Sequence, residues 1–125
     1  MTSDVPPRRT TRNLGSLGAQ IDIPEGWSVT ANGAGFFLVD DNQQTRLSVW
    51  TERTAENMFD RLPRSGPGIA VTESVLPSSA RFYRRADAEG TAVFVDLALG
   101  NGRSLVCSCG PDLEPVCVSL RRAPT

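Results

Sequence analysis

Histidine and lysine are both absent from this chain of 125 residues. Without histidine, the chain lacks the imidazole that acts as general base in most catalytic triads and that is the commonest metal ligand. Without lysine, it lacks the amine that forms Schiff bases and the cation of a phosphate-binding loop. We therefore expect a protein that is not an enzyme, needs no cofactor or metal, and acts by binding.

A large net charge and a long apolar run are missing as well. The net charge is −1, so no overall field favours nucleic acid or an anionic membrane. All 13 cationic residues are arginines, a bias typical of a GC-rich bacterial genome. Residues 1–12 contain no apolar segment of a signal peptide, and no later run reaches membrane-spanning length. The sequence predicts a cytoplasmic protein without a nucleic-acid or membrane partner.

What the chain does contain is enough for one domain. Its length and its hydrophobic fraction of 39% suffice for a single buried core. Prolines, arginines and small polar residues near the N-terminus predict a disordered tail over residues 1–13. Residues 14–125 are then expected to form a single α+β domain.

Apolar and polar residues alternate along several short segments, which is the pattern of half-buried strands. Turn residues such as Asn32-Gly33 and Asn101-Gly102 separate these segments and favour antiparallel hairpins. The predicted strands cover residues 19–23, 27–31, 36–39, 45–51, 69–76, 80–86, 91–99 and 104–108.

Two other segments have the spacing of an amphipathic helix. Apolar residues recur at intervals of three and four over residues 54–62 and 111–121. Thr54 can cap the first segment, and Pro111 suits the start of the second. Strands and helices in this order predict an α+β fold, a single antiparallel sheet of five to seven strands with flanking helices. The predicted core is Trp27, Val29, Leu47, Val49, Phe59, Leu62, Val93, Val95, Leu97, Cys107, Val116 and Leu120.

Residues 21–29 (IDIPEGWSV) place Pro-Glu-Gly-Trp between two short apolar strands. This segment resembles the opening of the PsbP-like superfamily, and the pattern over about residues 17–122 is compatible with it. The superfamily is mostly non-enzymatic; it includes an extrinsic subunit of photosystem II, a Ran-binding nuclear import factor and chaperones of type VI secretion effectors. The resemblance implies one antiparallel sheet with flanking helices and a binding or adaptor role. It carries over no family site.

The three cysteines, Cys107, Cys109 and Cys117, do not have the spacing of a zinc site. Cys107 and Cys109 share a face of a predicted strand, and Cys117 lies on the apolar face of the following helix. Two interpretations stay open. The residues are three small thiols in the core, or Cys109 and Cys117 form a disulfide. A metal site or a catalytic thiolate is the weakest reading, because no histidine is present to lower a thiol pKa.

Arg81, Tyr83 and Arg85 share one face of a predicted strand. Arginine beside an exposed aromatic ring is typical of a protein interface. Trp50 points away from the core face of its own strand and would extend this contact surface. The alternatives are that terminal segments cover Trp50 and that the arginines are paired on a solvated sheet face. Their expected acidic partners are Asp87, Glu89 and Asp96.

No pair of carboxylates has a spacing that indicates acid–base catalysis. The sequence predicts a non-catalytic protein-binding module, of adaptor, chaperone or immunity type, that holds a partner polypeptide on a sheet face or groove. The alternative is a domain that binds a small molecule or lipophile in a pocket between sheet and helix. A deep apolar pocket would favour the second class, and a flat or grooved patch around Trp50 or Tyr83 would favour the first.

Overall fold

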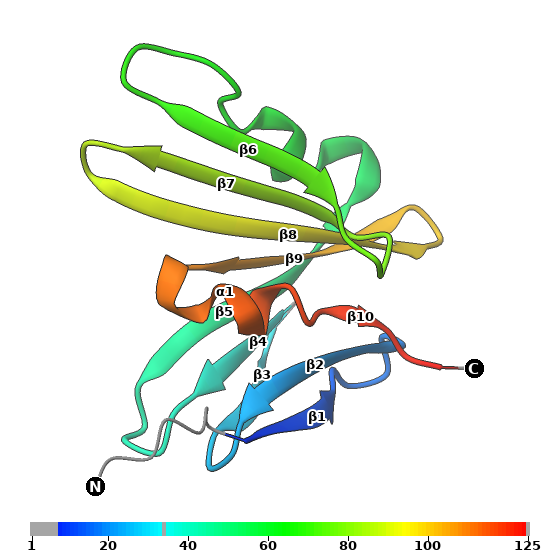
Figure 1. Cartoon of the computed structure of the whole chain (residues 1–125). Coiled ribbons are helices and arrows are strands. Elements are labelled where there is room, and N and C mark those ends of the chain that lie inside the picture. Colours follow the sequence, from blue (N-terminus) through cyan, green and yellow to red (C-terminus); the bar gives the residue numbers. More distant parts are fainter. Residues whose placement is uncertain (1–7, 34, 125) are drawn as a thin grey trace, which may run out of the picture.

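The computed structural model describes residues 8–33 and 35–124 of the chain. These residues form mostly β-strands, which are arranged in two antiparallel sheets with only short helical turns between them (Figure 1). The prediction of an α+β fold with a single antiparallel sheet and flanking helices is therefore wrong. Each predicted strand is nevertheless present, and two further strands complete the smaller sheet.

The larger sheet has seven strands in the order β3-β4-β5-β9-β8-β7-β6, so β3 and β6 form its edges. It consists of two meanders, which are joined where β5 pairs with β9. Its strands are β3 (Ser28–Asn32), β4 (Gly35–Val39), β5 (Thr45–Arg53), β6 (Ala70–Val75), β7 (Arg81–Asp87), β8 (Gly90–Gly100) and β9 (Arg103–Cys109).

The smaller sheet joins the two ends of the described chain. Its central strand β2 (Ala19–Pro24) pairs with β1 (Arg9–Asn13) on one side and with β10 (Arg121–Arg122) on the other. Part of the predicted disordered tail, residues 1–7, lies outside the described residues. The rest of the tail is corrected by the structure, because Arg9–Asn13 is hydrogen-bonded strand.

The segment predicted as a helix over residues 54–62 forms two 3-10 turns, η1 (Thr54–Glu56) and η2 (Met58–Arg61). Asn57 lies between them in an extended conformation. Its side-chain oxygen accepts the N–H of Phe59 at 2.9 Å, and its amide nitrogen donates to Asp96 at 2.6 Å. An asparagine that bonds nearby backbone competes with helix formation, so these contacts interrupt the helical spacing.

The C-terminal segment predicted as a helix over residues 111–121 is also shorter. It contains η3 (Pro111–Leu113) and α1 (Glu114–Cys117), and then it enters β10. Ser119 ends the helical stretch because its hydroxyl donates to the Val116 carbonyl at 2.6 Å and accepts the Asp22 N–H at 2.9 Å. None of the helices in the described ranges is long and apolar enough to cross a membrane.

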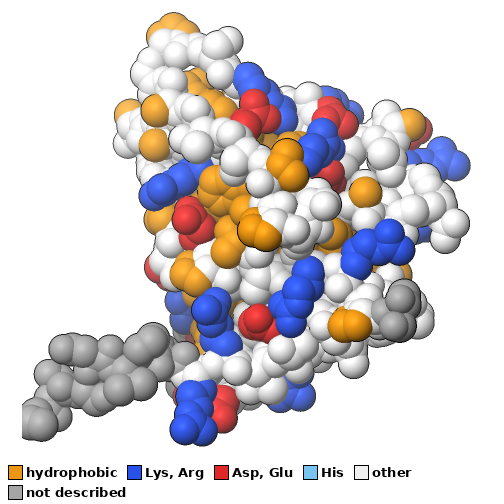
Figure 2. Space-filling view, turned by 45° about the vertical axis from the view of Figure 1, so that its right-hand side comes forward, with side chains coloured by type: hydrophobic (Ala, Val, Ile, Leu, Met, Phe, Trp, Pro, Cys, Tyr) orange, Lys and Arg blue, Asp and Glu red, His pale blue; other side chains and the backbone are white. Residues whose placement is uncertain are grey.

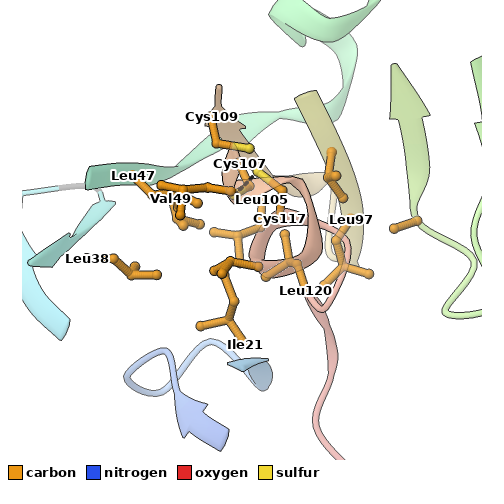
Figure 3. Close-up of a cluster of buried hydrophobic side chains, with 14 of the residues drawn as sticks. Ile21, Leu38, Leu47, Val49, Leu97, Leu105, Cys107, Cys109, Cys117 and Leu120 are labelled. Atoms are coloured by element: carbon orange, nitrogen blue, oxygen red, sulfur yellow. Dashed lines mark hydrogen bonds between the residues drawn. The ribbon is translucent and has the colours of Figure 1, made fainter. Parts of the chain in front are cut away.

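The hydrophobic core lies between the two sheets, with α1 packed against β2, β8 and β9 (Figure 1). Figure 3 shows side chains from both sheets and from the C-terminal segment meeting there. Nine of the twelve predicted core residues are buried, and Trp27, Val29 and Leu62 are half-buried. The buried nine are Leu47, Val49, Phe59, Val93, Val95, Leu97, Cys107, Val116 and Leu120.

Candidate functional site

The seven-stranded sheet has a second face, which points away from the core, and we call it the outer face. Side chains alternate between the two faces of a strand, so the residues between core positions lie on it. Cross-strand register places Phe37, Ser48, Ser108, Phe94 and Tyr83 in one row. The next row contains Gly35, Trp50, Val106, Asp96 and Arg81.

Tyr83 lies on the outer face, yet its side chain is fully buried. Its ring makes edge contacts with Phe59 of η2 and with Phe94 of β8, at centroid distances of 6.1 and 5.9 Å. Its hydroxyl donates to the Pro63 carbonyl at 2.5 Å, and the Arg64 guanidinium lies 5.2 Å from the ring centroid. The premise that Tyr83 is an exposed interface residue is wrong, because the η2 segment covers it.

Arg81 is held in the same cluster by acidic partners. It donates two hydrogen bonds to Asp96, at 3.0 and 2.7 Å, and one to Asp60 at 2.6 Å. Its guanidinium also lies 4.6 Å from the centroid of the Phe59 ring. Burial lowers the pKa of Arg81, but the hydrogen bonds to Asp60 and Asp96 outweigh this effect and raise it. The arginine is part of the packing that fixes η2 on the sheet.

Arg85 is half-buried and pairs with Asp87 at 3.6 Å. The alternative interpretation of paired arginines is thus confirmed for Arg81 with Asp96 and for Arg85 with Asp87. The four residues predicted to bind a partner do not form one exposed patch. A direct role of Arg85 in binding stays a prediction.

Trp50 is a predicted contact residue that keeps some exposure, as Arg81 and Arg85 do. It lies on the outer face, half-buried, opposite the buried Val106 and near the half-buried rings of Phe37 and Phe94. The described parts of the terminal segments do not cover it, because β1 and β10 pair with β2 and α1 packs in the core, on the opposite side of the sheet. A contact role of Trp50 stays a prediction.

The three cysteines come together on the core side of β9, where α1 crosses it (Figure 3). All three are free thiols and buried. The sulfur atoms of Cys107 and Cys117 lie 2.9 Å apart, and Cys117 also hydrogen-bonds with Cys109. Burial raises the pKa of Cys117. The pKa of Cys109 is raised mainly by its hydrogen bond with Cys117 and also by burial. Thiols with raised pKa values are poor nucleophiles, so the cluster suits a core better than catalysis.

The alternative function, binding of a small molecule or lipophile, requires a pocket, and the surface has hollows that can be compared with this requirement. A hollow of about 560 Å³ lies between the β2–β3 turn and the C-terminal segment, against Trp27, Leu113 and Val116. The Arg46 guanidinium lies 5.5 Å from the Trp27 ring centroid in its wall. The charged side chains around this hollow give it a polar rim. They are Arg9, Glu25, Arg46 and Asp112.

Charges of both signs are mixed on the face of the molecule that Figure 2 draws. Figure 2 shows acidic and basic side chains interspersed on one face of the molecule, with hydrophobic side chains in small groups between them. Within residues 8–33 and 35–124, no group of three or more acidic, cysteine or histidine side chains is placed to hold a metal ion.

The free edge of β6 is the feature that sequence reasoning missed. In the described part of the chain β6 pairs with β7 on one side only, since it ends the strand order of the larger sheet. Val75 is 71% exposed on this strand. The alternation of its residues predicted a strand correctly, but a local pattern does not reveal whether a strand lies at the edge or the centre of a sheet.

No family model and no curated protein matches the sequence of this chain. The resemblance of residues 21–29 to the PsbP-like superfamily stays a prediction. In the structure, Pro24 ends β2 and the N–H of Trp27 bonds the Pro24 carbonyl at 3.2 Å. The Pro-Glu-Gly-Trp segment is therefore the turn that carries the chain from the small sheet to the large one.

Proposed function

We propose that this chain is a non-catalytic protein-binding domain that holds an extended segment of a partner polypeptide along the free edge of β6. The observation that carries the proposal is a six-residue edge strand that pairs, within the described residues, with β7 alone and carries an exposed hydrophobic side chain. An exposed strand edge is a template for strand addition by another chain. The net charge of −1 favours a polypeptide over nucleic acid, and the cytoplasm is the compartment we propose.

The backbone of β6 offers hydrogen-bonding groups on its outer side. Leu76, directly after the strand, donates its N–H to the Ala80 carbonyl at 2.8 Å, so this amide points toward β7. The direction of the backbone groups alternates along a strand. The N–H and C=O groups of Val71, Glu73 and Val75 therefore point away from β7. A partner strand would bond to these groups and extend the sheet.

The side chains beside these groups define the chemistry of the partner. Val71, Glu73 and Val75 lie on the outer face, and Glu73 forms a 3.1 Å ion pair with Arg64. A shallow hollow of about 270 Å³ extends from Val75 and Glu73 to Phe59. We infer a partner strand with apolar residues opposite the two valines and a basic residue opposite Glu73, because opposite charges across strands stabilise pairing.

A second copy of this chain fits the edge less well. Antiparallel pairing of two β6 strands about a two-fold axis at Glu73 would place the two Glu73 carboxylates opposite each other. Like charges directly opposite across a strand pair destabilise it. Charge complementarity thus favours a different polypeptide.

The test compares two substitutions of Val75. Val75→Pro removes the outward N–H, and proline is tolerated at an edge strand whose N–H faces solvent. Val75→Ala is the matched control, because it shortens the side chain and keeps the backbone donor. Proteins are captured from the source cells on each variant and quantified by mass spectrometry. We expect Val75→Pro to lose specific partners at least tenfold and Val75→Ala to retain most of them.

A second measurement uses a defined probe. Binding of a short fluorescent peptide of alternating valine and threonine with one central lysine is measured by anisotropy, against the same peptide with central glutamate. The lysine peptide should bind more tightly, and Val75→Pro should weaken its binding. Equal capture by wild type and Val75→Pro, with both proteins folded, would contradict the proposal. A homodimer that Val75→Pro abolishes would assign the edge to a second copy instead.

A further inference from the structure

We infer that Cys107 and Cys117 are the residues that form a disulfide when this protein is oxidised, with Cys109 left as the free thiol. Their sulfur atoms lie 2.9 Å apart, and both side chains are fully buried. The contact joins the middle of β9 to the last residue of α1 (Figure 3). This pairing differs from the Cys109–Cys117 disulfide that the sequence left open, and it does not depend on the proposed function.

Strand geometry excludes the pair within β9. Cys107 and Cys109 are two residues apart on an extended strand, so their Cα atoms are separated by about 6.6 Å or slightly more. That distance lies at the upper limit for a disulfide, and both side chains point in the same direction rather than toward each other. Cys117 is therefore the common partner, and Cys107 and Cys109 compete for it.

The competition favours Cys107. The Cys107 and Cys117 sulfur atoms already lie 2.9 Å apart, so a bond between them needs little movement of β9 or α1. Cys109 lies next to Gly110, where the chain leaves the strand, and it keeps slight exposure to solvent. Thiol reagents should reach this residue first.

The disulfide would connect the two sheets through α1. This helix packs on β9 of the larger sheet and on β2 of the smaller one, and the chain after it pairs with β2 as β10. A covalent bond from β9 to α1 would thus hold the C-terminal segment against the core. Closing the short loop between the two cysteines should also restrict the unfolded chain.

A small disulfide such as oxidised glutathione can act as the oxidant, because it accepts the two electrons that the cysteines lose. One cysteine thiolate attacks oxidised glutathione, so a mixed disulfide forms and one glutathione thiolate leaves. The second cysteine thiolate attacks the protein sulfur, and the Cys107–Cys117 bond forms as the second glutathione leaves. The protein loses two electrons and two protons, and oxidised glutathione becomes two molecules of glutathione. Because burial raises the pKa of Cys117, the reaction should be fast during refolding and slow in the folded protein.

The experiment locates the free thiol. The full chain is reduced, unfolded and refolded in a glutathione redox buffer, then denatured and labelled with N-ethylmaleimide. Cleavage on the N-terminal side of Asp112 separates Cys117 from the other two cysteines, and fragmentation shows whether the label is on Cys107 or Cys109. We expect the label on Cys109 and a peptide pair linked through Cys107 and Cys117. The oxidised protein should unfold at a Tm roughly 5–10 °C higher than the reduced one.

Two serine variants serve as matched controls. Cys109→Ser should keep the equilibrium constant of disulfide formation with glutathione within about twofold of wild type. Cys107→Ser should leave a Cys109–Cys117 bond that is at least tenfold easier to reduce, or none. Label on Cys107 in the wild type would assign the disulfide to Cys109 and Cys117 and overturn the inference. Three labelled thiols, or only bonds between chains, would also overturn it.

Discussion

The guanidinium of Arg81 meets the carboxylate of Asp96 across β7 and β8, with nitrogen–oxygen distances of 2.7 and 3.0 Å. Asp96 is 4% exposed, and the amide of Asn57 donates to its other oxygen at 2.6 Å. The pair therefore links the sheet to the segment that interrupts the predicted helix. A buried carboxylate without its partners is costly, so this contact fixes where η2 lies.

Replacement of Arg81 tests this relationship. Arg81→Ala should lower the free energy of unfolding by about 2–4 kcal/mol, because it leaves the buried Asp96 carboxylate without its cation. This loss of unfolding free energy is smaller than is usual when a fully buried ion pair is broken, because the Arg81 side chain is 41% exposed. Urea unfolding followed by fluorescence measures the change. Arg85→Ala is the control on the same strand and face, and it should cost less than about 1 kcal/mol. Equal costs would show that the Asp96 contact adds no special stability.

Tyr83 provides the second prediction. Tyr83→Phe should cost about 1 kcal/mol, because only the hydrogen bond to the Pro63 carbonyl is lost. Tyr83→Ala should cost about 3–5 kcal/mol, because it leaves a cavity between Phe59 and Phe94. Thermal and chemical unfolding of both variants measure the difference. If Tyr83→Ala folds with the wild-type Tm, the residue is not the packing centre that its burial indicates.

Acid sensitivity follows from Asp22. Burial raises the pKa of its carboxyl, but hydrogen bonds from Thr11 and Arg121 outweigh this effect and hold it below its usual 3.8. A group whose pKa is lower in the folded state adds stability above its unfolded pKa, and that stability is lost as the pH falls. We expect the wild type to lose more stability than Asp22→Asn between about pH 5 and pH 3.

Urea unfolding at a series of pH values measures this difference. Asp41→Asn, a change at an exposed turn residue, is the control and should follow the wild-type profile. Parallel profiles of the wild type and Asp22→Asn would show that the bonds of Asp22 between β1, β2 and β10 do not couple to the folding of the domain.

Gly35 gives a prediction about close packing between strands. A Cβ atom at this position would lie 2.5 Å from the carbonyl oxygen of Val49 and 3.1 Å from the Cα of Trp50. Gly35→Ala should therefore move β4 away from β5 and cost about 1–3 kcal/mol. Gly110→Ala is the control, because its Cβ would meet only the side chain of Asp112, which can move. A cost for Gly35→Ala no larger than that of Gly110→Ala would disagree with this strand spacing.

The strands could be predicted from the sequence because their signal is local. Alternation in segments such as residues 91–99, and turn pairs such as Asn101-Gly102, depend only on neighbouring residues, and both β8 and β9 formed as predicted. The helices could not be predicted equally well. Asn57 bonds to Asp96, which lies 39 residues away in the sequence. The helical spacing of residues 54–62 cannot reveal that contact.

The candidate site shows the same division. The sequence correctly placed Arg81, Tyr83 and Arg85 on one face of a strand, because side chains alternate with a period of two. It could not show that Phe59 and Arg64 cover this face, and so Tyr83 was predicted to be exposed. Likewise, the three cysteines were expected to meet, but the closest pair depended on how α1 sits over β9.

By itself, the sequence determined the eight strands from β2 to β9, most of the core and the absence of histidine and lysine chemistry. Only the tertiary structure decided that the strands form two sheets, that the η2 segment covers Tyr83, and that β6 has a free edge among the described strands. The physical reason is the separation in sequence of the residues that interact. Backbone preference and side-chain alternation act between neighbours, whereas sheet order and burial depend on contacts between residues far apart in the chain.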